Sequence, residues 1–229
     1  MGRPRLLGLL KPHYSVRLAF SLVSNFVQAI SISMSAPPIN PNWVTTLRLP
    51  LAPLAVVCLW WDTKESVIAT MIIAILLEIT DVADGIIARK YKIVTNFGKL
   101  YDPFSDAFCR YTLFLGLFSM GHASLWMLLL IFYRDSSISF FRSIAASQSI
   151  VVGARRSGKI KAIVQGVGVQ FAFLFIVLDK FLDEPNLLQF PWWIMAVITV
   201  ITTASFLDYF AGYLPVLRKA WSEKPVKDQ

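Results

Sequence analysis

Six long apolar stretches constrain the fold of this 229-residue chain more than any other feature. They cover approximately residues 43–61, 65–88, 102–120, 123–149, 162–182 and 192–214. A helix needs about 20 apolar residues to cross a bilayer, and these stretches have that length. Only 16% of the residues are charged, against about 25% in an average soluble domain. The sequence therefore predicts an all-α membrane protein with six transmembrane helices.

The first 41 residues have a different pattern. Between residues 15 and 34, apolar side chains recur every four positions, and polar side chains fall mostly on another side. This pattern predicts an amphipathic helix that lies in the membrane interface, with a seventh spanning helix as the alternative. We therefore expect an N-terminal interfacial segment at 1–41, a six-helix domain at 42–217 and a basic cytoplasmic tail at 218–229.

Lysine and arginine alternate along the segments that flank and connect the apolar stretches. The N-terminal segment, the second-to-third connection, the fourth-to-fifth connection and the tail are rich in both, whereas the intervening connections carry mainly Asp and Glu. The positive-inside rule then places both termini in the cytoplasm, and we expect a bacterial inner membrane. Attraction to anionic membrane lipids accounts for the net charge of +8, so no nucleic-acid partner is expected.

Four aspartates interrupt the apolar pattern where the second stretch ends and the third begins. Asp81 and Asp84 are three residues apart, and Asp102 and Asp106 are four apart, so each pair shares one helix face. The short connection makes the two helices antiparallel neighbours, and the four carboxylates can converge. Four like charges require cations, and hard divalent metals prefer oxygen ligands. The pattern predicts a metal site, with a cation or proton path through a transporter as the alternative.

The aspartates belong to a longer pattern, D-x2-D-G-x2-A-R-x8-G-x3-D-x3-D. It resembles the signature of the CDP-alcohol phosphatidyltransferase family, and every fixed position matches. These positions are Asp81, Asp84, Gly85, Ala88, Arg89, Gly98, Asp102 and Asp106. The resemblance implies a homodimeric enzyme that moves a phosphatidyl group from CDP-diacylglycerol to an alcohol and releases CMP.

The same resemblance implies roles for the aspartates. Asp81, Asp84 and Asp102 would be metal ligands, and Asp106 would be both a ligand and the general base. Two ions, Mg²⁺ or Mn²⁺, would bridge the pyrophosphate of the CDP-lipid. The acceptor hydroxyl, deprotonated by Asp106, would attack the lipid-side phosphorus.

A second set of residues is expected at the CDP-lipid. Gly85 and Ala88 keep the helix surface low enough for a nucleotide to approach, and Arg89 offers a planar donor fork to phosphate. Asn42, Thr45 and Arg48 resemble the N-x2-T-x2-R opening of the phosphatidylglycerophosphate synthase branch. Helix capping is the alternative for the first two, whereas an arginine so deep in a span needs a partner. The expected donor set is Asn42, Thr45, Arg48, Gly85, Ala88, Arg89 and Gly98.

Cations further along the chain indicate the acceptor. The arrangement R-[ED]-x2-I-S-x2-R, followed by G-K-x-K-x3-Q, is similar to the same branch and begins here at Arg134. It implies transfer to glycerol 3-phosphate, whose charge of about two units requires surrounding cations. The expected phosphate ligands are Arg110, Arg134, Arg142, Lys159 and Lys161.

Several alternatives remain open for the acceptor. That branch often has Lys directly after the last motif aspartate, where this chain has Ala107, and Arg110 one turn later is its expected substitute. Inositol, inositol phosphate and phosphatidylglycerol are the alternative acceptors. Arg134 and Arg142 could instead form internal ion pairs with Asp135 or Asp208, and Lys159 and Lys161 could serve only the loop charge bias.

Overall fold

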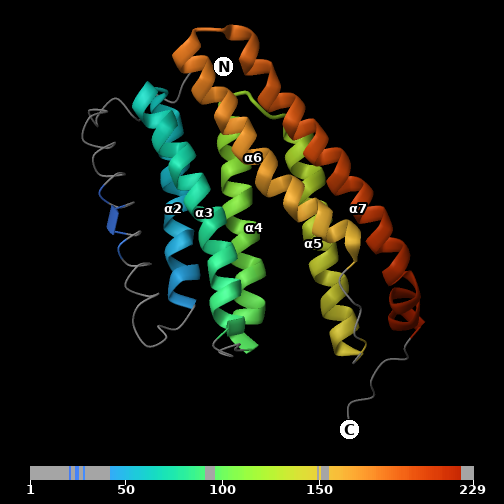
Figure 1. Cartoon of the computed structure of the whole chain (residues 1–229). Helices are drawn as coiled ribbons and strands as arrows, with labels where there is room; N and C mark the ends of the chain where they lie inside the picture. The colour runs from blue at the N-terminus through green and yellow to red at the C-terminus, as the bar shows by residue number, and fades with distance from the viewer. Residues whose placement is uncertain are drawn as a thin grey trace.

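In the computed structural model, the described residues are 21, 24, 25, 28, 42–90, 96–148, 150 and 155–222. Side chains are described for these residues except at 42–44, 82–90, 96, 99, 100 and 185. The elements in this part of the chain are all helical (Figure 1). They are α2 (Asn42–Trp61), α3 (Lys64–Lys90), α4 (Asn96–Ser119), α5 (Leu125–Ser147), α6 (Arg156–Leu182), the short 3₁₀ helix η2 (Pro185–Leu188) and α7 (Gln189–Ser222).

Each of the six predicted apolar stretches corresponds to one long helix, so the all-α prediction is confirmed for the described residues. Two helical segments, Arg156–Leu182 and Asn186–Ser222, are long and apolar enough to cross a membrane. Three boundaries differ clearly from the prediction: α4 begins six residues before Asp102, α6 begins six residues before Ala162, and α7 continues into the predicted tail. The predicted amphipathic helix at 15–34 lies outside the described residues, apart from four exposed helical positions at 21, 24, 25 and 28.

The helices pack in two connected groups. α2 packs against α3 and α4, while α7 packs against α5 and α6, and contacts between α3 and α6 join the groups. One large apolar core runs through both, with Phe114, Met127 and Phe173 among its fully buried side chains. A smaller core, which includes Ile138 and Tyr213, joins the distal parts of α5 and α7. Burial of apolar surface in these two cores holds the helices that carry the candidate site.

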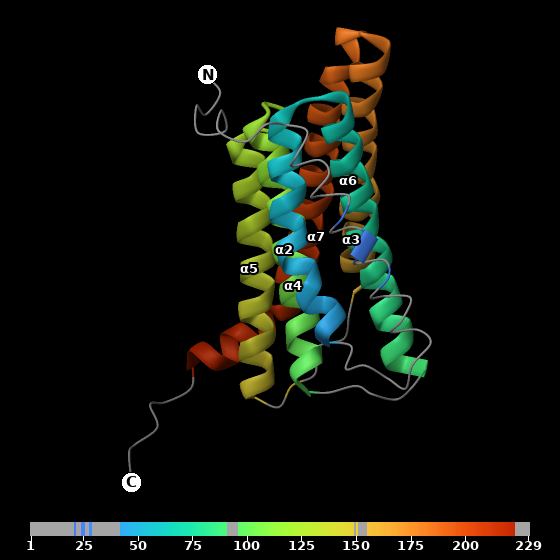
Figure 2. The same cartoon turned by 90° about the vertical axis from the view of Figure 1, so that its left-hand side faces the viewer.

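Prolines lie inside three of the helices and change their course. Pro50 and Pro53 lie in α2, Pro103 in α4 and Pro215 in α7. A proline removes a backbone donor and bends a helix, and the last turns of α7 leave the bundle sideways (Figure 2). Pro103 follows Asp102 directly, so the acidic face of α4 lies where its backbone ladder is interrupted.

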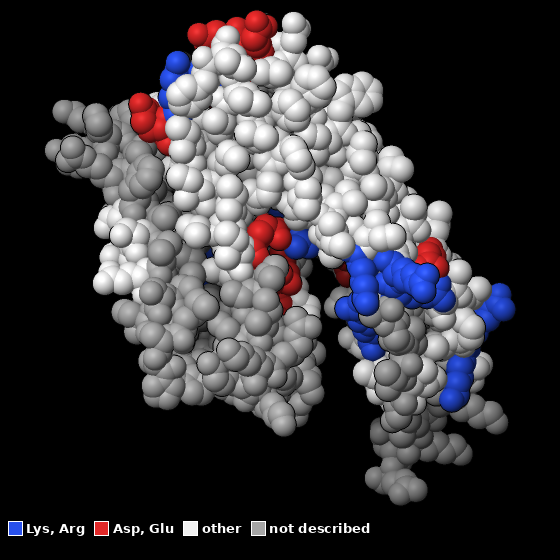
Figure 3. All heavy atoms as spheres, in the orientation of Figure 1, with Lys and Arg blue, Asp and Glu red and all other residues white. Residues whose placement is uncertain are grey.

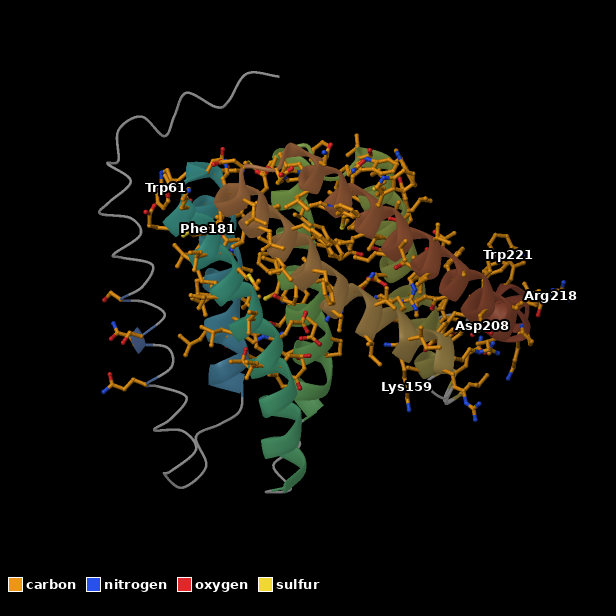
Figure 4. All side chains as sticks on the ribbon, turned by 45° about the horizontal axis from the view of Figure 1, so that its top comes forward. Trp61, Lys159, Phe181, Asp208, Arg218 and Trp221 are labelled. Carbon is orange, nitrogen blue, oxygen red and sulfur yellow. The ribbon has the colours of Figure 1, made fainter. Side chains whose placement is uncertain are left out.

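The helix connections alternate between two ends of the molecule. At one end, Lys180 Nζ lies 2.7 Å from Asp62 Oδ1, which brings the end of α6 to the α2–α3 connection. There the indole of Trp192 also donates to Ser124 Oγ at 3.1 Å. Figure 4 shows Trp61 and Phe181 near this end, far from Lys159 and Asp208. The alternation of charge along the sequence therefore corresponds to two ends of one bundle.

Candidate active site

Arg48 on α2 joins the two acidic helices. Its Nη1 donates to Asp81 Oδ1 at 2.9 Å, and its Nη2 donates to Asp106 Oδ1 at 2.8 Å. Arg48 is only 3% exposed, and two carboxylate partners offset the cost of burying its charge. We call Arg48, Asp81 and Asp106 the acidic cluster. The sequence predicted convergence by direct pairing of α3 and α4, but these helices make few direct contacts, and α2 packs against both.

Asp102 lies at the exposed side of this cluster. The buried Thr45 hydroxyl lies 3.4 Å from Asp102 Oδ1 and is the donor of that hydrogen bond. The hydroxyl of Ser105 donates to the backbone oxygen of Thr45 at 3.3 Å. Because α2 already begins at Asn42, Thr45 lies inside the helix, and the capping interpretation is wrong for this residue. Thr45 instead ties the start of α2 to the motif face of α4.

The other motif residues are placed by the backbone. Asp84, Gly85, Ala88 and Arg89 lie in the last turns of α3, and Asn42 is the first residue of α2; their side chains are outside the described set. Gly98 is buried in the first turn of α4. Among the described side chains, which exclude Asp84, no group of three His, Cys, Asp or Glu residues forms a metal site. Yet carboxylates from two helices already converge on one cation, the Arg48 guanidinium, and oxygen donors of this kind suit a hard divalent metal.

A cleft of about 1140 Å³ opens beside the acidic cluster, between α4, α5 and α6. Asp106 lies on its α4 side. All five cations predicted to bind the acceptor phosphate line it: Arg110, Arg134, Arg142, Lys159 and Lys161. In Figure 3, acidic side chains lie beside the hollow in the lower half of the molecule, and basic side chains gather on its opposite side. The fold thus brings the predicted base and the predicted anion ligands to one cavity.

Two of these five cations are held by an internal aspartate. Lys161 Nζ lies 2.8 and 3.0 Å from the two carboxylate oxygens of Asp135, and Arg134 Nη1 lies 2.6 Å from Oδ1. Arg134 and Lys161 are 8% and 7% exposed. Arg134 Nη2 donates to Ser205 Oγ at 2.9 Å, and the Tyr111 hydroxyl donates to Asp135 Oδ2 at 3.2 Å. We call Arg134, Asp135 and Lys161 the basic cluster. The alternative interpretation, that Arg134 forms an internal ion pair, is confirmed by its contact with Asp135.

The other three cations are more available to an anion. Arg110 Nη2 lies 3.8 Å from Glu78 Oε1, which is a loose ion pair. Arg142 and Lys159 are both exposed, and neither forms an ion pair within the described part of the chain. Cations without a carboxylate partner have the most electrostatic energy to gain from a phosphate. Arg142 and Lys159 are therefore the strongest candidates for anion binding in the cleft.

Sequence reasoning missed several residues of the cleft. Arg155 and Tyr209 line it, and Arg155 forms an ion pair with Asp208. Asp208 was one of two partners considered for Arg134 and Arg142 in the ion-pairing alternative, but its partner in the structure is Arg155. The cluster of basic residues around Arg155 was visible in the sequence. No local pattern indicates that the partner of Arg155 is Asp208, 53 residues away.

An acidic cluster suited to a divalent cation, beside a basic cleft, is the arrangement of an enzyme that transfers a phosphate-linked group. The family described as CDP-alcohol phosphatidyltransferase matches residues 38–204, which is most of the chain. The chain belongs to this family. It is therefore an enzyme of this class, and the transporter alternative is wrong.

Three curated relatives carry the same name, CDP-diacylglycerol–glycerol-3-phosphate 3-phosphatidyltransferase. The protein from Treponema pallidum is 31% identical over 161 residues, which are 66% of this chain and 73% of the relative. The protein from Bacillus subtilis is 29% identical over 183 residues, 75% of this chain and 93% of the relative. The protein from Rickettsia felis is 28% identical over 179 residues, 76% of this chain and 96% of the relative. The family match at residues 38–204 includes the acidic motif and the helices α4, α5 and α6 that line the cleft.

Proposed function

We propose that this enzyme transfers a phosphatidyl group from CDP-diacylglycerol to glycerol 3-phosphate, giving phosphatidylglycerophosphate and CMP. One observation carries the proposal: the cleft that contains Asp106 also contains Arg142 and Lys159, two cations without a described ion-pair partner. A phosphorylated alcohol brings about two negative charges into a site beside several aspartates, and only nearby cations make that favourable. The names of the three relatives support the same acceptor.

Asp106 is the proposed general base. Its carboxylate lines the cleft, so it can take the proton of an acceptor hydroxyl bound there. The freed oxygen attacks the phosphorus on the lipid side of the pyrophosphate, and CMP leaves without a covalent enzyme intermediate. Arg48 holds the carboxylate of Asp106 in place through its bond to Oδ1.

Divalent metal ions, Mg²⁺ or Mn²⁺ and two per site, would be held by Asp81, Asp84, Asp102 and Asp106. When bound, they supply orientation of the pyrophosphate and stabilise charge on the leaving group. The remaining motif residues would bind the CDP-lipid: Asn42, Thr45, Arg48, Gly85, Ala88, Arg89 and Gly98. Support for that group is positional, because the start of α2, the end of α3 and the start of α4 carry them together with the aspartates.

The acceptor phosphate would contact Arg110, Arg142 and Lys159 directly. Arg134 and Lys161 would complete the phosphate pocket from deeper positions, where Asp135 sets their geometry. A neutral acceptor such as inositol has no negative charge for these cations to bind. The number of cations in the cleft therefore favours glycerol 3-phosphate over inositol. Inositol phosphate and phosphatidylglycerol carry a phosphate as well, so they are the acceptors that the experiment must separate.

We also propose a membrane arrangement. All six long helices of the 42–217 domain would span the inner membrane, with the 1–41 segment in the interface and the 218–229 tail in the cytoplasm. The cleft and both termini would face the cytoplasm, because the positive-inside rule places the basic segments on that side and Lys159 of one such segment lines the cleft. Single cysteines at Lys159 and Lys180 test this, after Cys58 and Cys109 are replaced: in right-side-out vesicles an impermeant thiol reagent should label only position 180. Labelling at position 159 would contradict this orientation.

The family resemblance further predicts that the enzyme is a homodimer.

The test of the reaction is CMP release from CDP-diacylglycerol by the purified enzyme. The acceptor panel is glycerol 3-phosphate, glycerol, inositol, inositol phosphate and phosphatidylglycerol, with Mg²⁺, with Mn²⁺ and with a chelator. We expect glycerol 3-phosphate to outcompete glycerol and inositol by a wide margin, and the chelator to stop the reaction. Equal or faster CMP release with inositol would contradict the assigned acceptor.

A further inference from the structure

Asp208 on α7 holds the beginning of α6, although no motif in the sequence explains it. Its carboxylate accepts hydrogen bonds from Arg155 Nη1 and from the hydroxyl of Ser157. Arg155 Nη1 also donates to the backbone oxygen of Asp208 at 2.8 Å. The two charged side chains are 41% and 36% exposed, and a lone ion pair at such exposure stabilises a protein only weakly. Several bonds from one short segment to one residue instead fix the position of that segment.

The backbone of both helices is shaped for this contact. The backbone N–H of Arg155 donates to the hydroxyl of Tyr209, a buried residue, at 3.1 Å. A Cβ on Gly158 would lie 3.0 Å from Cε2 of the Tyr209 ring and closer still to its hydroxyl, and a Cβ on Gly212 would overlap the guanidinium of Arg155. Glycine thus stands at two places where α7 and the start of α6 lie too close together for a larger side chain. We call Arg155, Ser157 and Asp208 the α6 joint.

The α6 joint adjoins the cleft. Arg155 is the N-cap residue of α6, and its side chain makes no capping bond to the helix. Lys159 follows about one turn later, and both residues line the cleft. Figure 4 shows Lys159 and Asp208 on α6 and α7 at the same end of the molecule. A first helical turn lacks part of its internal hydrogen bonds, so the direction of Lys159 depends on what anchors that turn.

We propose that Asp208 is a positioning residue for the acceptor: it fastens the first turn of α6 to α7 and so holds Lys159 at the cleft. The inference rests on the proposed function in taking this cleft as the acceptor site. Asp208 itself does not line the cleft, so it acts through Arg155 and Ser157. The effect is confined to the acceptor because the acidic motif lies on α3 and α4, away from the joint.

The test is a comparison of Michaelis constants in Asp208→Asn. We expect the KM for glycerol 3-phosphate to rise by about tenfold, with the KM for CDP-diacylglycerol and kcat at saturating acceptor changed by less than about twofold. Asp208→Glu keeps the charge and should recover part of the lost affinity. The matched control is Lys180→Met, which removes the ion pair to Asp62 at the opposite end of α6 and should change neither constant.

Two results would overturn the inference: an unchanged acceptor KM in Asp208→Asn, or a parallel rise in both KM values. If Asp208→Asn does not purify as a folded protein, Ser157→Ala takes its place, since it removes one bond and keeps the ion pair; about a threefold rise in acceptor KM is then expected. Failure of the proposed function gives a different result. If the proposed function is wrong, the wild-type enzyme prefers another acceptor in the panel. The KM values of the wild type and of Asp208→Asn are then compared with that acceptor.

Discussion

The acidic cluster and the basic cluster are built in opposite ways. In the acidic cluster, one buried arginine lies between two aspartates, because Arg48 bonds Asp81 and Asp106. In the basic cluster, one aspartate lies between two buried cations, because Asp135 bonds Arg134 and Lys161. Each cluster contains a single counter-ion that offsets repulsion between like charges.

The two counter-ions differ in what they connect. Arg48 on α2 reaches residues on α3 and on α4, so it joins three helices of the fold. Asp135 on α5 also reaches two other helices, because it accepts hydrogen bonds from Lys161 on α6 and from Tyr111 on α4, but all of its partners line the cleft. Loss of Arg48 should therefore affect folding, whereas loss of Asp135 should affect ligand binding. The following variants test this difference.

Asp106→Asn should have the largest effect on activity. An amide cannot accept the hydroxyl proton at neutral pH, and loss of a general base typically lowers turnover by about 10²–10⁴-fold. CMP release should fall accordingly, while CDP-diacylglycerol binding in equilibrium measurements stays close to that of the wild type. Asp81→Asn serves as the comparison and should weaken metal dependence and donor binding together. Normal turnover in Asp106→Asn would contradict the assignment of Asp106 as the general base.

Arg48→Met should destabilise the fold. It leaves two carboxylates of the acidic cluster without their shared cation, and breaking a buried ion pair costs about 3–5 kcal/mol. Chemical unfolding of the detergent-solubilised enzyme measures this change in the free energy of unfolding. Arg48→Lys keeps the charge but cannot reach both carboxylates with a planar fork, so an intermediate loss is expected. A wild-type unfolding midpoint for Arg48→Met would show that the bridge does not stabilise the fold.

Asp135→Asn should weaken acceptor binding rather than donor binding. Without the carboxylate, two buried cations repel each other and lose the geometry that Asp135 imposes. We expect the KM for glycerol 3-phosphate to rise by about tenfold, with the donor KM near the wild-type value. A fall in acceptor KM would mean that Asp135 competes with the phosphate for these cations, and the positioning role would be wrong.

Arg142→Gln should have the smallest effect of the series. Arg142 lies outside both clusters, so its removal takes one cation from the cleft and leaves no buried charge unpaired. A phosphate anchor binds ground state and transition state alike, so the acceptor KM should rise by about fivefold with kcat unchanged. If both KM values rose together, the residue would belong to the donor pyrophosphate.

Local features of this protein follow from the sequence alone. Six helices and their approximate limits are predicted by hydropathy and by the positions of prolines and charges, because helix formation depends on short windows of chain. The shared faces of Asp81 with Asp84, and of Asp102 with Asp106, follow from helical spacing. Five of the cations that line the cleft were also identified from their pattern, and the structure brings all five to one cavity, although Arg155 was missed.

The partners of the charged residues were decided only by the tertiary structure. Arg48 lies 33 residues from Asp81 and 58 from Asp106, and Arg155 lies 53 residues from Asp208. Over such separations, a pair forms only if helix packing and rotation bring both side chains to one place, and no local pattern encodes either. An arginine buried inside a helix bundle needs a counter-ion, but the sequence contains several Asp and Glu residues that could supply it. Packing of α2 against α3 and α4, and of α6 against α7, selects among them.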